Sequence, residues 1–68
     1  MIQSGCRIEG EVNDSTLLQG VVVKNGAIVD GCLVGQGAII SEEAHLQNVI
    51  VDHGANVPSG HIQTGGVF

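Results

Sequence analysis

A repeat of seventeen residues constrains this chain more than any other feature of its sequence. The stretch 27–43, AIVDGCLVGQGAIISEE, is preceded by a copy of itself at 10–26 and followed by another at 44–60. Aligned copies share three aliphatic columns, whose members are separated along the chain by five, six and six residues. The columns are Val12, Val29 and Leu46; Leu17, Val34 and Val51; and Val23, Ile40 and Val57. A fixed period of this kind is typical of solenoid proteins, which stack one structural unit per repeat.

Each copy divides into three short segments of the form small–X–aliphatic. Alternation with period two predicts that each segment is a short strand whose first and third residues face inward. Gly, Asn and Asp lie between the segments, and they tolerate the left-handed backbone conformation of a sharp corner. The expected corners are Asn13-Asp14, Gln19-Gly20, Asn25-Gly26, Asp30-Gly31, Gln36-Gly37, Asn48, Gly54 and Gly60. Three strands and three corners per copy predict an all-β fold, a single-stranded parallel β-helix of about 3.5 triangular coils.

The inward positions alternate between small and large side chains, as a narrow triangular interior requires. The small positions are Gly10, Ala27 and Ala44; Ser15, Cys32 and Val49; and Val21, Ala38 and Ala55. Phe68 is the only aromatic residue, so the core must be built from aliphatic side chains, Ala and Cys. Free cysteine behaves as a small hydrophobe, and we expect Cys6 and Cys32 to be free thiols rather than a disulfide.

The middle residue of each segment points outward and supplies the candidate interface residues Ile28, Leu33, Ile39 and Ile50. Thr16, Leu33 and Ile50 are expected to form a column on one wall. Two interpretations remain open. Such residues can simply suit strands, since β-branched side chains favour extended backbone. Alternatively, contiguous exposed aliphatic residues mark a surface that packs against a partner domain or subunit.

The repeat also sets the expected boundaries. Residues 10–60 form three coils, residues 1–9 an incomplete leading coil that is two residues shorter at its last corner, and residues 61–68 a tail. We expect a single domain that is a fragment of a larger protein. Open coil ends and a small core also predict self-association, because solenoid ends need to be covered.

Charge and composition exclude several classes of function. The net charge is −5, and Arg7 and Lys24 are the only Lys or Arg residues, which argues against binding to nucleic acid or to an anionic membrane. No signal peptide or run of transmembrane length is present in the sequence. We therefore expect a cytoplasmic protein.

The three histidines do not predict a catalytic or metal site. His45, His53 and His61 are spaced eight residues apart, about half a coil, so neighbours in this series lie on different walls. Asp52-His53 could form an acid–base pair, but no nucleophile or pocket accompanies it. Glycine-rich stretches lack the Lys-Ser/Thr pair and the helix of a phosphate-binding loop. No catalytic residue, cofactor or metal ligand is assigned.

The small residue two positions before each anchor, repeated at hexapeptide spacing, resembles the hexapeptide-repeat family. That resemblance implies a left-handed coil, although the general rule for parallel crossovers is right-handed. The stretch 5–52 is similar to the carboxy-terminal β-helix of glucose-1-phosphate adenylyltransferases, which make ADP-glucose and pyrophosphate from ATP and glucose 1-phosphate in glycogen biosynthesis. The run Gly-Cys-X-Ile-X-Gly-X-Val at 5–12 resembles the non-catalytic, GlgD-like regulatory subunit.

The resemblance implies an assembly or regulatory module without chemistry of its own, because the nucleotidyltransferase domain of the family is absent from this stretch. Expected partners are further copies of the chain, or a nucleotidyltransferase domain or subunit. The alternative is the β-helix portion of a trimeric hexapeptide acyltransferase, in which His45 or His61 would act at a cleft between subunits. The tail at 61–68 does not match the repeat pattern.

Overall fold

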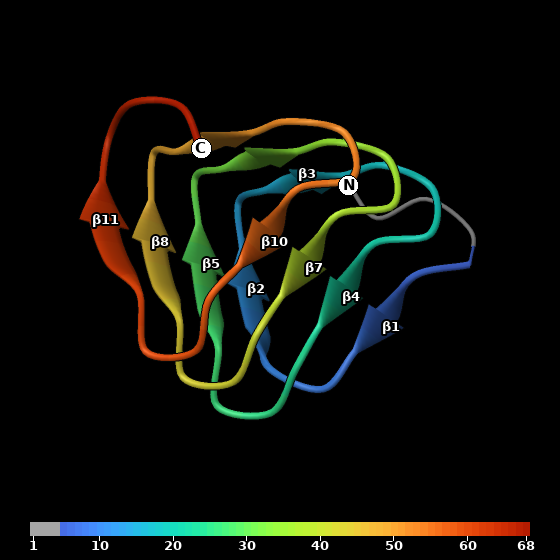
Figure 1. Cartoon of the computed structure of the whole chain (residues 1–68), viewed down its shortest axis with the longest axis horizontal. Helices are drawn as coiled ribbons and strands as arrows, with labels where there is room; N and C mark the ends of the chain where they lie inside the picture. The colour runs from blue at the N-terminus through green and yellow to red at the C-terminus, as the bar shows by residue number, and fades with distance from the viewer. Residues whose placement is uncertain (1–4) are drawn as a thin grey trace.

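The computed structural model describes residues 5–68 as a parallel β-helix of eleven short strands, and no helix occurs among these residues. The strands form three parallel sheets that make the walls of the coil (Figure 1). The β1 wall contains β1 (Arg7–Ile8), β4 (Val22–Val23), β7 (Ile39–Ile40) and β10 (Asn56–Val57). The β2 wall contains β2 (Glu11–Asn13), β5 (Ile28–Asp30), β8 (His45–Gln47) and β11 (Ile62–Thr64). The β3 wall contains β3 (Thr16–Leu17), β6 (Leu33–Val34) and β9 (Ile50–Val51).

Residues that are aligned in the sequence repeat are paired in neighbouring strands of each wall. Val12 pairs with Val29, and Val29 pairs with Leu46, one repeat further on. The same seventeen-residue step relates the neighbouring strands of all three walls, except at the first pair. The expected period and the parallel β-helix are therefore confirmed.

The anchors and small residues predicted to face inward form one continuous core. Eight of the nine anchors are buried, and the ninth, Val12 in the first coil, is partly buried and packs against them. Ser15 is the only polar residue among the buried ones described. Its hydroxyl donates to the carbonyl of Asn13 at 2.8 Å and accepts from the amide of Cys32 at 3.0 Å. Cys6 and Cys32 are free thiols, as predicted.

The corners adopt the left-handed backbone conformation that the sequence predicts. Positive φ angles recur at the corners between walls, and three of these residues are not glycine: Asp14 (48°), Glu43 (60°) and Asn48 (55°). An L-residue in this region is strained because its Cβ approaches the carbonyl oxygen. Glu43 occupies the position that Gly26 and Gly60 occupy in the neighbouring coils.

The corner between β1 and β2 is two residues shorter than the equivalent corners of the later coils, between β4 and β5, β7 and β8, and β10 and β11. Arg7 pairs with Val22 and Ile8 with Val23, so the step between β1 and β4 is fifteen residues. Gly10 makes the shortcut possible, because a Cβ at this position would lie 2.4 Å from the carbonyl oxygen of Ala27. Of the predicted leading coil at 1–9, residues 5–9 are described and include β1, and residues 1–4 lie outside the described range.

The last eight residues continue the β-helix, whereas the sequence pattern sets 61–68 apart as a tail. β11 pairs with β8, and Val67 forms a bridge to Ile50. The sequence of residues 61–68 does not show the repeat, because polar side chains occupy inward positions of the coil. His61 follows Ala44 in the small column, and Gln63 follows Leu46 in the anchor column.

Candidate interaction surface

The structure places the four candidate interface residues on three different walls. Leu33 and Ile50 are neighbours on the β3 wall and are 45% and 50% exposed. Ile28 lies on the β2 wall and Ile39 on the β1 wall, and both are only partly exposed. Of the four residues, only Leu33 and Ile50 are neighbours on one wall.

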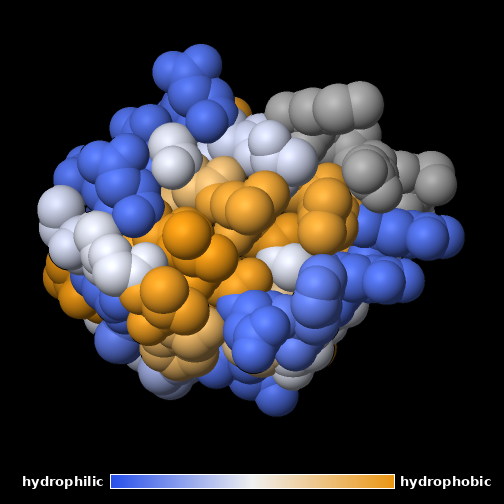
Figure 2. All heavy atoms as spheres, turned by 90° about the horizontal axis from the view of Figure 1, so that it is seen from above, coloured by the Kyte–Doolittle hydropathy of each residue, from blue (hydrophilic) through white to orange (hydrophobic). Residues whose placement is uncertain are grey.

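A continuous aliphatic column covers the outer face of the β3 wall. Leu33 lies between Thr16 and Ile50 in the ladder, and Val67 extends the column beyond Ile50. Val67 is 70% exposed, so the column becomes more exposed towards the carboxy-terminal end. Figure 2, which looks onto this wall, shows a continuous hydrophobic area bordered by hydrophilic residues. Of the four large aliphatic residues most exposed in the described part of the chain, three belong to this column.

Sequence reasoning missed Val67 because it treated the last eight residues as a tail. The signal was available in the period itself, since Val67 follows Ile50 by one repeat of seventeen residues. We call Leu33, Ile50 and Val67 the apolar column from here on.

The outer faces of the other two walls are interrupted by polar side chains. On the β2 wall the corresponding positions are Glu11, Ile28, His45 and Ile62. On the β1 wall they are Arg7, Val22, Ile39 and Asn56. Neither wall carries three large exposed aliphatic residues in succession.

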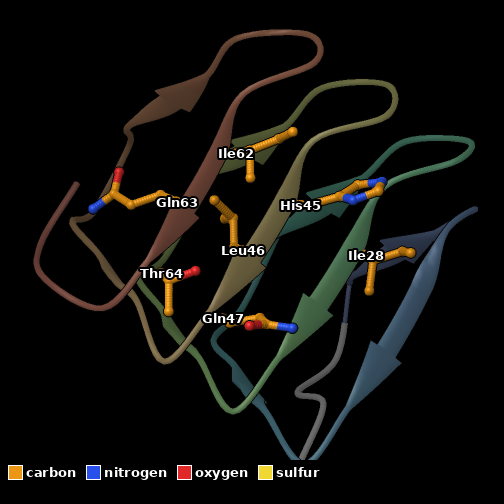
Figure 3. Close-up of a pocket in the computed structure, with 7 residues that line it drawn as sticks. All are labelled: Ile28, His45, Leu46, Gln47, Ile62, Gln63 and Thr64. Carbon is orange, nitrogen blue, oxygen red and sulfur yellow. The ribbon is translucent and has the colours of Figure 1, made fainter.

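A shallow hollow lies on the β2 wall, between two rows of outward side chains (Figure 3). Ile28, His45 and Ile62 form one row, while Gln47 and Thr64 form the other. Leu46 and Gln63 complete the lining. None of the lining residues is Asp, Glu, Lys or Arg. The hollow therefore offers no fixed charge to a phosphate or a carboxylate ligand.

The histidines do not converge on a common site. His45 is exposed on the outer face of β8, whereas His61 occupies an inward position. His53 lies at a corner, where its Nδ1 accepts a hydrogen bond from the amide of Gln36 at 2.8 Å and its own amide donates to Asp52 Oδ1 at 2.8 Å. The first of these bonds holds the imidazole ring of His53 against the neighbouring coil. Among residues 5–68, no three His, Cys, Asp or Glu side chains are grouped so that they could hold a metal ion.

The described residues contain no helix that is long and apolar enough to cross a membrane.

Comparisons with known proteins agree with the coil geometry. The glucose-1-phosphate adenylyltransferase of Corynebacterium jeikeium (strain K411) is 38% identical over 63 residues, which is 91% of this chain. Those of Bacillus cytotoxicus and Bacillus cereus (strain Q1) are 39% and 37% identical over 62 residues. In each case the chain spans 16% of the length of the relative.

A family model described as the GlmU-like, C-terminal hexapeptide matches residues 1–65, nearly the whole chain. The match agrees with the structure, in which neighbouring strands of a wall are seventeen residues apart. The chain therefore belongs to the GlmU-like C-terminal hexapeptide family.

Proposed function

We propose that this β-helix is an assembly module and that the β3 wall is its contact surface. The observation that carries the proposal is the apolar column, in which Leu33, Ile50 and Val67 are 45%, 50% and 70% exposed in succession. Contiguous exposed aliphatic residues usually mark an interaction surface. Burying one Leu, Ile or Val side chain completely stabilises a contact by about 1.5–3 kcal/mol before the costs of association.

Strand propensity alone does not account for the column. Leu33 is not β-branched, so the preference of branched side chains for strands gives no reason for a leucine at an exposed strand position. The equivalent rows on the other walls are mixed, with Glu11 and His45 on the β2 wall and Arg7 and Asn56 on the β1 wall. Among the described residues, an uninterrupted run of large exposed aliphatic side chains therefore occurs on the β3 wall alone.

The partner we propose is the same wall of a second copy. Thr16 and the apolar column carry no charge, so a two-fold contact between two β3 walls places apolar surface against apolar surface. The net charge of −5 on each copy opposes the approach. Salt screens this repulsion, and added salt should therefore strengthen the association.

By family and similarity, we place the module in a protein of the glucose-1-phosphate adenylyltransferase type, which forms ADP-glucose from ATP and glucose 1-phosphate in the cytoplasm. The relatives that carry this name are about six times longer than the matched stretch. The module would serve assembly and regulation there, as in a GlgD-like subunit, while catalysis lies in other parts of the protein. A nucleotidyltransferase domain encoded next to this stretch would support this placement.

Association through the β3 wall is tested by sedimentation velocity on the Leu33→Glu variant. We expect the wild-type chain to sediment as a dimer or larger species and Leu33→Glu to sediment as a monomer with an unchanged circular dichroism spectrum. Ile62→Glu is the matched control, because Ile62 is 74% exposed at the equivalent position of the β2 wall. An unchanged mass for Leu33→Glu, or an equal loss of mass for Ile62→Glu, would remove the proposal.

The acyltransferase alternative is tested by titrating the chain with acetyl-CoA in a calorimeter and assaying acetyl transfer. We expect neither binding nor transfer, because His61 occupies an inward position and the hollow beside His45 is lined by no Lys or Arg that could bind the phosphates of acetyl-CoA. Acetyl transfer that is lost on His45→Ala would favour the alternative over an assembly module.

A further inference from the structure

The corner between β4 and β5 contains the only Asn-Gly pair of the sequence, Asn25-Gly26. In such a pair the backbone nitrogen of glycine can attack the side-chain amide of the asparagine, because glycine has no Cβ to obstruct the approach. Both residues are exposed, and Gly26 has a positive φ of 79°. The pair therefore combines the residue types that deamidation requires with access to water.

The backbone amide at the second position of this corner is paired in the two later coils. The amide of Glu43 donates to the carbonyl of Asn25 at 3.3 Å, and the amide of Gly60 donates to that of Glu42 at 3.0 Å. In both cases the acceptor belongs to the preceding coil. An amide held in this way must break its hydrogen bond before its nitrogen can attack a side chain.

The amide of Gly26 has no such acceptor among the described residues. The preceding corner, between β1 and β2, lacks two residues, and the carbonyl that would lie opposite Gly26 is missing with them. The side-chain amide of Asn25 also makes no hydrogen bond within residues 5–68. Both reacting groups of the pair are thus free of competing bonds in this part of the chain.

We propose that Asn25 is a site of spontaneous deamidation, made reactive by the shortened corner in front of it. The backbone nitrogen of Gly26 forms a bond to Cγ of Asn25, and the side-chain nitrogen leaves as ammonia with the proton of the Gly26 amide, which closes a succinimide. Water then adds to either carbonyl carbon of this ring and yields aspartate or isoaspartate.

Either product changes the corner in charge, and isoaspartate also inserts a methylene group into the main chain. The new carboxylate adds one negative charge to a chain whose net charge is −5. Its position is followed, one repeat later in the same corner column, by Glu42. Like charges in adjacent coils repel each other, so the reaction weakens the contact between these two corners.

The proposal is tested by building the same pair one coil later. The double variant Glu42→Asn with Glu43→Gly places an Asn-Gly pair at the equivalent corner, where the backbone amide of residue 43 donates to the preceding coil. The variant is incubated at neutral pH, both folded and in concentrated urea. Deamidation at positions 25 and 42 is followed by tandem mass spectrometry after digestion with pepsin at acidic pH. Dividing each folded rate by the rate in urea removes the effect of the flanking residues.

We expect this ratio to be about two- to tenfold higher at position 25 than at position 42, which is the factor for one hydrogen bond that must open first. Equal ratios, or a higher ratio at position 42, in a variant that retains the strand signal in circular dichroism would overturn the proposal.

Amide hydrogen exchange of the wild-type chain gives a second test, which decides the matter if the double variant does not fold. After correction for intrinsic rates, Gly26 should exchange about two- to tenfold faster than Glu43 and Gly60. Equal protection of the three amides would refute the free amide at this corner. So would an Asn25 that stays intact in the folded chain while it deamidates in urea.

Discussion

The β2 and β3 walls have the same interior and different exteriors. Both present one small and one large inward side chain per coil, for example Ala27 with Val29 and Cys32 with Val34, all of which are buried. Outward, the β2 wall alternates aliphatic residues with Glu11 and His45, whereas the β3 wall carries an uninterrupted aliphatic column beyond Thr16.

This difference shows that the inward residues determine the fold, whereas the outward residues determine which surface is available for contact. Interior positions are constrained by the width of the triangle, because close packing leaves no room for a change of volume. Outward positions are not constrained in this way, since many side chains suit an exposed strand. A run of aliphatic residues at such positions is therefore not explained by folding, and contact is the explanation that we propose for it.

The largest expected effect contrasts the inside and the outside of a single wall. Leu46→Ala removes a fully buried anchor of β8 and should lower the free energy of unfolding by about 2–5 kcal/mol. Ile62→Ala truncates a 74% exposed side chain on the neighbouring strand and should change it by no more than about 0.5 kcal/mol. Urea denaturation followed by circular dichroism measures both. Equal losses would mean that the two faces of the wall do not differ in the way described.

A substitution at the corner that leads into the β2 wall is expected to stabilise the fold, by less than Leu46→Ala destabilises it. Glu43 is held at a φ of 60°, where its neighbours in the corner column are Gly26 and Gly60. Glu43→Gly should raise the free energy of unfolding by about 0.5–1 kcal/mol, because relief of the strained backbone exceeds the added flexibility of the unfolded chain. The control Glu42→Gly should give no gain, since Glu42 is not among the residues with positive φ. A gain for both variants would show that backbone strain at Glu43 is not the cause.

The sequence predicted the interior better than the surface. The anchors, small positions and corners could be predicted because each coil repeats the same steric requirement every seventeen residues. The apolar column could be predicted only in part, since Leu33 and Ile50 were expected on one wall and Val67 was not. Ile28 and Ile39 point outward as expected, but they lie on other walls than Leu33, and nothing in the repeat ranks one wall above another.

The last described part of the β-helix could not be predicted from the repeat, because polar residues at its inward positions break the pattern. His61 and Gln63 read as a departure from the pattern, although their backbone continues the ladder through β11. Val67 was not predicted for the same reason, although it is the most exposed member of the apolar column.

The central claim is that the β3 wall is the contact surface, and methyl NMR over a dilution series tests it most directly. We expect concentration-dependent shifts at the methyl groups of Leu33, Ile50 and Val67, while those of Ile28 and Ile62 on the β2 wall stay constant. Shifts that are confined to Ile28 and Ile62, or that are absent while the average mass changes with concentration, would contradict the account.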